Sequence, residues 1–277
     1  MQLTYLGTAM IDLRVGDARF VTDPALDPRG TTYDFGMWCT PRSWFASEKQ
    51  YDTPPLDAGA IDAVLLSHDQ HADNLDFAGR KLLGEERIAR CITTVAGAKR
   101  LSRPRVENDR PGKGLALGER IVSLAPAATT RIGRVVVRAI VARHGPRFVP
   151  QVHEVTGFVV DVDAGPRIWI SGDTVMFPAL AETLSAIGKE RPVDVAVVHC
   201  GAVAFPKALG FGSARFTFDA ADVVEACKLV QAKTIIPIHR SGWAHFRQAE
   251  SELLPTLEAA GLAERTKLLA LGESVTL

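Results

Sequence analysis

The sequence predicts a layered α/β or α+β protein, because apolar strand patterns recur along the chain and helical patterns join them toward its end. Short apolar runs bounded by Gly, Pro, Asp and Asn are typical of buried strands. They lie at Gln2–Leu6, Arg19–Thr22, Ala63–Ser67, Ile121–Leu124, Val135–Ala142, Thr156–Val162, Arg167–Ser171, Val193–His199, Thr234–Ile238 and Lys267–Leu271. Strands dominate the first two thirds and then alternate with helices, which favours helices covering sheets.

Apolar residues at helical spacing predict five helices between these strands. They are expected at Leu75–Leu83, Val95–Leu101, Pro178–Ile187, Asp219–Val230 and Arg247–Ala260. Asp219 is the expected N-cap of the fourth helix, and Gly261 the expected stop of the fifth. No long repeat, low-complexity tract or linker interrupts the chain, so we expect one domain over residues 1–277.

The composition excludes several classes of protein. With 47% hydrophobic and 23% charged residues, the chain has enough apolar material for a sizeable core and is not disordered. Its 32 basic residues balance 32 acidic ones, so nucleic acid is not the expected partner. No signal peptide is visible and no uncharged apolar stretch reaches the about 20 residues of a membrane span, so we expect a cytoplasmic protein. If it forms an oligomer, a symmetric dimer is the default.

The four cysteines lie far apart and form no Cys-x-x-Cys pair, so neither a thiolate zinc finger nor a thioredoxin-like redox site is indicated. Cys91, Cys200 and Cys227 lie in apolar patterns and are expected to be buried packing residues. Cys39 lies in an aromatic-rich segment, Asp27–Pro54, without clean periodicity. Such a loop either covers a pocket or pins itself to the surface.

Four strand patterns end in potential metal ligands. The densest is Ser67 to Asp76, which reads Ser-His-Asp-Gln-His-Ala-Asp-Asn-Leu-Asp and follows an apolar strand. The other three ligands are His144, Asp173 and His239, each directly after or near the end of a strand pattern. Imidazoles and carboxylates are donors that zinc accepts. Since strand ends are where loops assemble sites in layered α/β folds, we expect these residues to converge.

Each candidate also has a structural interpretation. A lone His after a strand is often only a hydrogen-bonded structural residue, and Asp173 fits a turn or helix-capping acid. Asp73 or Asn74 fits the N-cap of the helix expected at Leu75. What favours a site is that all four patterns occur in one chain.

Their order, spacing and context resemble the metallo-β-lactamase superfamily, in its compact lactonase-like and phosphodiesterase-like branch. The resemblance rests on Tyr5-Leu6-Gly7-Thr8-Ala9, Thr22-Asp23-Pro24, the Ser67–Asp76 cluster, His144-Gly145-Pro146, Gly172-Asp173-Thr174 and Ile236-Pro237-Ile238-His239. It implies a four-layer αββα sandwich of two mixed β-sheets flanked by helices.

The resemblance also implies two metal positions. The first would take His68, His71 and His144. The second would take Asp73, the residue at position 74 and His239, with Asp173 between the metals.

The chain departs from the family pattern His-x-His-x-Asp-His at two points. Its histidines, His68 and His71, are three residues apart, so either one residue is inserted or Asp69 replaces the first His. We favour His68 because it follows Ser67. Asn74 replaces the final His, and since an amide oxygen is a poorer zinc ligand than imidazole, the second position should be weaker, harder or empty. Alternatively, Asn74 caps the helix and holds Asp73 in position.

The function implied is hydrolysis of a small ester, lactone, amide or phosphodiester. The cofactor would be one or two divalent metals per chain, with zinc favoured over manganese and iron, and would lower the pKa of bound water to roughly 7. Asp73 is the candidate catalytic residue that orients this water or shuttles its proton. Two alternatives are an iron-dependent redox enzyme on the same fold and an inactive metabolite-binding member.

Further residues near these motifs are weaker candidates. Asp23 is a candidate partner of a ligand His, or else a simple turn acid. His245 could face the substrate and Arg147 could hold an anionic group, although an exposed loop position also fits both. His153 and His199 have no assigned role.

Overall fold

The computed structural model describes residues 1–35, 42–105, 113–148, 153–205, 214–248 and 250–277. Thirteen of its strands form two sheets, and β4 (Thr32–Asp34) pairs with β5 (Ala46–Glu48) apart from them. The first sheet consists of β1 (Gln2–Gly7), β2 (Met10–Val15), β3 (Ala18–Thr22), β6 (Ala63–Leu65), β7 (Cys91–Thr94), β8 (Ile121–Leu124) and β15 (Ser274–Thr276). The second consists of β9 (Thr129–Ile132), β10 (Val135–Val141), β11 (Thr156–Val162), β12 (Arg167–Ile170), β13 (Val195–His199) and β14 (Thr234–Ile238).

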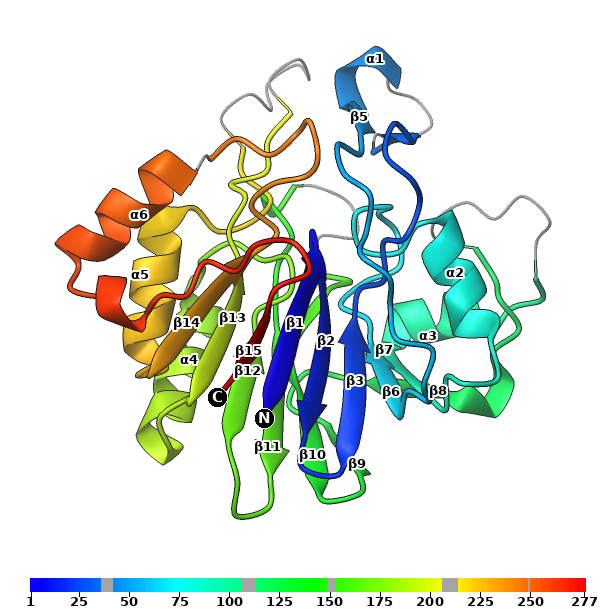
Figure 1. Cartoon of the computed structure of the whole chain (residues 1–277), viewed down its shortest axis with the longest axis horizontal. Helices are drawn as coiled ribbons and strands as arrows, with labels where there is room; N and C mark the ends of the chain where they lie inside the picture. The colour runs from blue at the N-terminus through cyan, green and yellow to red at the C-terminus, as the bar shows by residue number, and fades with distance from the viewer. Residues whose placement is uncertain (36–41, 106–112, 149–152, 206–213, 249) are drawn as a thin grey trace.

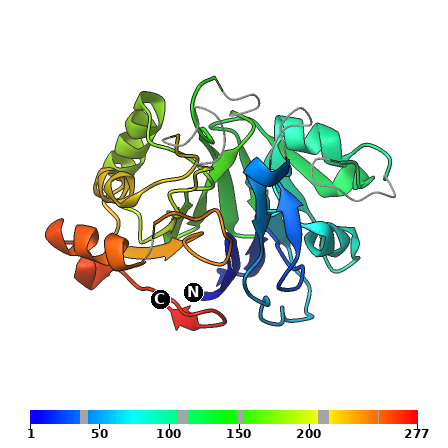
Figure 2. The same ribbon diagram turned by 90° about the horizontal axis from the view of Figure 1, so that it is seen from above.

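Both sheets mix parallel and antiparallel strands. Their strand orders are β15-β1-β2-β3-β6-β7-β8 and β14-β13-β12-β11-β10-β9. The helices are α1 (Arg42–Phe45), α2 (Phe77–Gly84), α3 (Val95–Leu101), α4 (Pro178–Glu190), α5 (Ala220–Leu229) and α6 (Glu250–Ala259), with short 3-10 turns at Gly118–Arg120 and Ala263–Arg265. Helices α2 and α3 lie outside the first sheet, and α4, α5 and α6 outside the second (Figures 1 and 2).

Three apolar clusters hold these four layers together. One lies between the sheets and includes Phe20 and Phe158, both almost fully buried. A second joins the second sheet to α4, α5 and α6 around Trp169, and a third joins the first sheet to α2 and α3. This is the αββα sandwich that the family resemblance implied, and it forms because both sheets carry apolar side chains on both faces that need to be covered.

The strand directions bring the carboxyl ends of several strands to one end of the molecule. In the second sheet β12, β13 and β14 are parallel. Strand β10 runs in the same direction, because β10 and β12 are both antiparallel to β11. In the first sheet β3, β6, β7 and β8 are parallel. Loops that follow these strands can therefore meet above the sandwich.

The expectation of a strand at Lys267–Leu271 is wrong. Lys267 donates its backbone N–H to Ile235 O over 2.8 Å, next to an isolated bridge between Thr266 and Ile235, but no strand forms there. The last strand is β15, which pairs with β1. Strand β2 was missed because Asp12 and Arg14 break its apolar pattern.

The helix expected at Leu75 begins two residues later. Asp76 is its N-cap, and its side chain accepts the N–H of Gly79 over 2.7 Å. The interpretation of Asp73 or Asn74 as the cap is therefore wrong. Asp219 caps α5 by accepting the N–H of Asp222 over 2.9 Å, as expected.

Several smaller expectations can also be compared with the structure. Cys91, Cys200 and Cys227 are buried free thiols, which confirms their packing role. Cys39 lies outside the described residues. Within the described part of the chain, no helix is long and apolar enough to cross a membrane.

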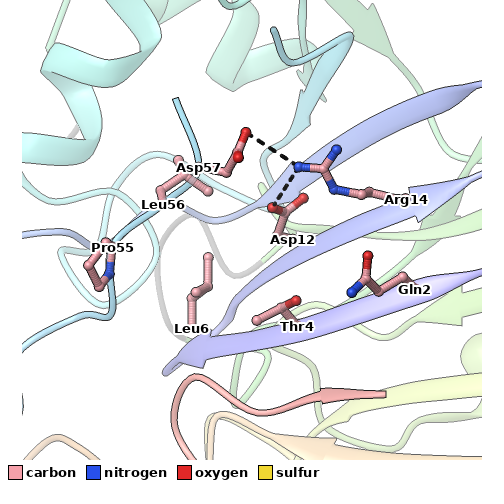
Figure 3. A pocket seen from close by; sticks show the side chains of 8 residues that line it. All are labelled: Gln2, Thr4, Leu6, Asp12, Arg14, Pro55, Leu56 and Asp57. Carbon is pink, nitrogen blue, oxygen red and sulfur yellow. Dashed lines mark ion pairs between the residues drawn. The ribbon is translucent and has the colours of Figure 1, made fainter. Parts of the chain in front are cut away.

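A polar pocket of about 450 Å³ lies on the outer face of β1 and β2 (Figure 3). Arg14 crosses it and pairs with Asp57 at 3.4 Å and Asp12 at 3.9 Å. Arg19, which is buried, also pairs with both carboxylates. None of the predicted site residues lines this pocket, and its ion pairs fasten the segment around Asp57 to the sheet.

Candidate metal centre

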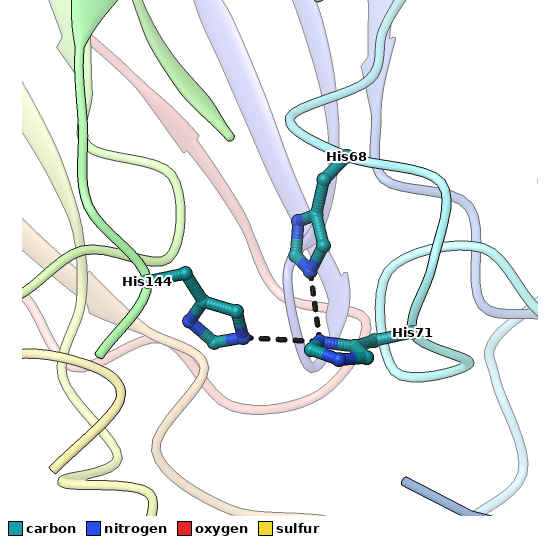
Figure 4. A group of neighbouring side chains, drawn as sticks. All are labelled: His68, His71 and His144. Carbon is teal, nitrogen blue, oxygen red and sulfur yellow. Dashed lines mark hydrogen bonds between the residues drawn. The ribbon is translucent and has the colours of Figure 1, made fainter. Parts of the chain in front are cut away.

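Three histidine side chains converge at the end of the molecule where the carboxyl ends of the strands meet (Figure 4). His68 and His71 follow β6, and His144 follows β10. His71 Nδ1 lies 3.1 Å from His68 Nε2 and 3.0 Å from His144 Nε2. The three ring nitrogens lie within 4.8 Å of one another. The structure therefore brings together the three residues predicted for the first position.

Hydrogen bonds on the far side of two rings indicate where their protons lie. His144 Nδ1 is 2.7 Å from Phe216 O, and since a carbonyl only accepts, Nδ1 carries the hydrogen. In its neutral form His144 then presents a lone pair from Nε2 to the cluster. His68 Nδ1 lies 3.0 Å from Ser67 Oγ, which accepts in the same way when His68 Nε2 is bare.

His68 and His71 are neutral at physiological pH. Burial, and then the neighbouring imidazoles, lower the pKa of His68 well below its ordinary value. The same causes lower the pKa of His71 to about 4. With His68 and His144 presenting lone pairs from Nε2, the single hydrogen that His71 Nδ1 can carry satisfies only one of them. This is the arrangement that a shared cation stabilises.

A second group contains Asp73, Asp173 and His239, all nearly or fully buried. His239 Nε2 lies 3.3 Å from Asp73 Oδ2 and 3.4 Å from Asp173 Oδ2. Neither ring nitrogen of His239 has a hydrogen-bond partner among the described residues. Burying an imidazole without hydrogen bonds is energetically unfavourable, so a bound cation would stabilise this group as well.

The two carboxylates of this group are ionised. Burial acts to raise the pKa of Asp73, but the adjacent imidazoles of His239 and His245 outweigh it and hold the pKa well below its usual range. For Asp173, burial is likewise outweighed by His239 and His199, which lower its pKa. Burial lowers the pKa of His239, but the two carboxylates raise it overall.

Asn74 lies between the two carboxylates. When its amide is oriented to satisfy its neighbours, the nitrogen donates to Asp173 Oδ2 at 3.1 Å and to Asp73 Oδ1 at 3.2 Å. The amide oxygen then takes the place 3.4 Å from Ser67 Oγ. One expectation from the sequence was that Asn74 caps the helix and holds Asp73 in position. Asn74 is not the cap, but its amide does hold Asp73.

His245 is buried, so the interpretation as an exposed loop residue is wrong. Its Nε2 lies 3.1 Å from Asp73 Oδ2 and its Nδ1 lies 2.7 Å from Ser47 Oγ. Arg147 and His153, in contrast, are exposed.

His199 was left without a role by the sequence, yet it belongs to this centre. It lies at the end of β13, and its Nδ1 donates to Asp173 Oδ1 over 2.8 Å. Its ring stacks on that of His239, with centroids 5.4 Å apart. The available signal was its position at a strand end, between the strands that lead to Asp173 and His239.

Two further acids position the loop that carries His68. Asp23 accepts the backbone N–H of Ser67 over 2.7 Å, and its own backbone has a φ of 35°. It thus acts on the residue before His68 and not on a ring nitrogen. Asp69 pairs with Arg100 at 2.6 Å and is fully buried, so its carboxylate is already engaged. This favours His68 over Asp69 at the first position.

Aromatic rings surround the histidines. Phe35 lies 5.8 Å from His71 and 4.6 Å from His245, between ring centroids. Phe205 stacks on His245 at 5.3 Å, and Phe216 meets His144 edge to face at 5.8 Å. Phe35 comes from the aromatic-rich segment, which therefore contacts the centre. Trp38 of that segment lies outside the described residues.

Both groups of side chains fit a divalent cation. Ligand atoms about 2.0–2.2 Å from zinc in a tetrahedral site lie roughly 3.3 Å from one another. The distances from His71 Nδ1 to its two neighbours, and from His239 Nε2 to its two carboxylates, match that spacing. The first position offers three nitrogens, and the second offers two oxygens and one nitrogen.

Comparison with known proteins agrees with this fold. Residues 18–240 match the model of the beta-lactamase superfamily domain. The chain therefore belongs to the beta-lactamase superfamily, in the metallo-β-lactamase fold that the structure shows.

Individual relatives are distant or partial. A metal-dependent hydrolase from Pelotomaculum thermopropionicum is 34% identical over 121 residues, which cover 44% of this chain and 45% of that protein. The chain thus matches less than half the length of this relative. Isothiocyanate hydrolase from Delia radicum gut bacteria has a TM-score of 0.76 at 19% identity and covers 100% and 99% of the two chains. The diiron β-hydroxylase CmlA from Streptomyces venezuelae has a TM-score of 0.67 at 16% identity, covering 100% and 54%.

Proposed function

We propose that this protein is a metal-dependent hydrolase that directs an activated water at a small ester, lactone, amide or phosphodiester. The observation that carries the proposal is the convergence of three imidazole nitrogens from His68, His71 and His144. Three histidine nitrogens and an open fourth position form one of the donor sets of catalytic zinc sites. The metal-dependent hydrolases among its relatives support the same class.

The side chains of this centre have separate tasks. A divalent cation bound here would supply a water of pKa roughly 7 and polarise the substrate oxygen. His68, His71 and His144 would hold it at the first position, and Asp73, Asp173 and His239 at the second. Asp73, which is held ionised, would orient the attacking water by accepting a hydrogen bond from it.

The aromatic rings limit the substrate. Phe35 and Phe205 place apolar surface beside His71 and His245, where it excludes water and matches an apolar group on a small substrate. The isothiocyanate hydrolase of the same fold adds a small uncharged electrophile to the compounds worth testing. We therefore rank uncharged esters, lactones and isothiocyanates ahead of phosphodiesters.

The test is metal content together with hydrolysis. We expect the purified, unchelated protein to carry one or two divalent metals per chain by elemental mass spectrometry, and chelation to abolish hydrolysis reversibly. His144→Ala should lose activity and metal, whereas His153→Ala, at an exposed histidine, should keep both. A protein that binds no metal after reconstitution, or a His144→Ala variant of full activity, would refute the proposal.

An iron-dependent redox enzyme is the second candidate. The two-oxygen, one-nitrogen group of Asp73, Asp173 and His239 is a donor set that iron accepts, and a diiron hydroxylase shares the fold. Bound iron together with oxygen consumption would favour this candidate, whereas hydrolysis under anaerobic conditions would favour the first.

A further inference from the structure

The two cation positions of this centre differ in their donor atoms. Among the residues that the structure describes, the first group offers imidazole nitrogens only, from His68, His71 and His144. The second is lined by carboxylate oxygens of Asp73 and Asp173 and by one imidazole, His239. Carboxylates suit harder cations such as Mn²⁺, whereas imidazoles suit zinc.

Asn74 cannot compensate for the missing imidazole by offering its oxygen. Its amide nitrogen faces both carboxylates, and its oxygen faces Ser67 Oγ. The resulting chain of hydrogen bonds is self-consistent. His68 Nδ1 donates to Ser67 Oγ, Ser67 donates to the Asn74 oxygen, and Asn74 donates to Asp73 and Asp173. Position 74 therefore organises the ligands of both positions without being one of them.

Two further imidazoles, His199 and His245, lie next to the second position and contact its carboxylates without belonging to the ligand group. His199 donates to Asp173 Oδ1 at 2.8 Å. His245 lies 3.1 Å from Asp73 Oδ2, and Ser47 Oγ can donate to its other nitrogen at 2.7 Å. With Ser47 as donor, His245 Nε2 carries the hydrogen and donates to Asp73. Both imidazoles then act on the ligands and leave the second position rich in oxygen.

We propose that the second position selects a harder divalent cation than the first, such as Mn²⁺ beside Zn²⁺, because His245 and Asn74 act as positioning residues that donate to Asp73. This inference rests on the proposed metal-dependent function. It concerns which cation each position prefers, and it departs from the symmetric zinc pair that an imidazole at position 74 would favour.

The first experiment compares affinities at the two positions. Metal-free protein is titrated with Zn²⁺ and with Mn²⁺ in buffers that set the free metal concentration, and bound Mn²⁺ is followed by electron paramagnetic resonance. The preference for Zn²⁺ over Mn²⁺ should be at least tenfold smaller at the second position than at the first. With one equivalent of Zn²⁺ and excess Mn²⁺, we expect one of each per chain. Equal preference at both positions would overturn the proposal.

Variants of His245 test its role as a donor. His245→Gln keeps an N–H beside Asp73, whereas His245→Ala removes it. We expect Mn²⁺ affinity at the second position to fall about 10- to 100-fold in His245→Ala and to be largely retained in His245→Gln, with Zn²⁺ at the first position unchanged in both. His153→Gln, at an exposed histidine, is the control. Equal loss in the two His245 variants would show that the imidazole is itself a ligand and would overturn the proposal.

A variant at position 74 tests the opposite change. Asn74→His restores an imidazole, so we expect Zn²⁺ affinity at the second position to rise at least tenfold relative to Mn²⁺. An unchanged ratio in a folded variant would count against the proposal. If the unaltered protein binds no metal at all, the proposed function itself fails. If it binds two metals with equal preference, only this inference fails.

Discussion

His199 donates a hydrogen bond from Nδ1 to Asp173 Oδ1 over 2.8 Å, between two side chains that are completely buried. Asp173 lies in the loop that follows β12, and His199 is the last residue of the adjacent parallel strand β13. The ring of His199 also stacks on His239. One residue therefore orients two members of the second group.

Replacing His199 by Phe should weaken both stability and metal binding. The ring volume is kept, but Asp173 loses its buried donor, which costs about 1–3 kcal/mol of unfolding free energy. Metal affinity should fall about 10- to 100-fold. His199→Asn, whose amide can replace Nδ1, should recover part of both. Urea denaturation and metal titration measure these effects, and a His199→Phe variant with unchanged metal affinity would contradict this role.

The buried pair of Asp69 and Arg100 should be necessary for the loop that carries His68. Asp69 is fully buried and bonded to Arg100 at 2.6 Å. Arg100→Leu leaves this buried carboxylate without its cationic partner, so we expect a loss of about 3–5 kcal/mol in unfolding free energy. Adding Asp69→Asn removes the unpaired buried negative charge. The double variant should therefore be more stable than Arg100→Leu alone, and additive losses in a double-mutant cycle would refute the pairing.

Asp76 should make the stability of the protein depend on pH. Burial, and then the nearby charge of Asp27, raise the pKa of Asp76 from 3.8 to about 6. The folded state thus holds a proton that the unfolded state releases between these values, and the unfolding free energy falls as the pH rises through this range, by up to ~3 kcal/mol. Asp76→Asn should show a flatter profile in urea denaturation from pH 4 to 7. If the unfolding free energies of the unaltered protein and of Asp76→Asn changed with pH in the same way, Asp76 would not be the group responsible.

Gly7 should not tolerate a side chain, because Tyr51 occupies the space. Gly7 has a φ of 111°, and a Cβ there would lie 2.3 Å from the Tyr51 ring. The ring has little room to move away, since a Cβ added to Gly242 would lie 2.5 Å from its other edge. Gly7→Ala should therefore destabilise by well over 1 kcal/mol. Gly30 also has a positive φ but open space around it, so Gly30→Ala measures the backbone cost alone. If thermal unfolding showed the same loss of stability in Gly7→Ala and Gly30→Ala, the contact with Tyr51 would not be the cause.

How far the sequence predicts this centre depends on the kind of signal. His68, His71, His144, Asp173 and His239 were predicted because each follows an apolar strand pattern and because their order and spacing resemble the metallo-β-lactamase superfamily. His199 follows such a pattern too, but a lone histidine at a strand end has a structural role as often as a functional one. What separates them is the partner that each side chain meets, and the sequence does not contain it.

The sequence alone determined the layered class, most strands and the set of residues near one edge, because periodicity and strand-end position are local properties of the chain. Only the tertiary structure decided the roles within that set. It placed Asp69 on Arg100, Asn74 between two carboxylates, and His245 against Asp73. These contacts join residues up to 172 positions apart. They arise from how the two sheets pack, and no local pattern encodes that.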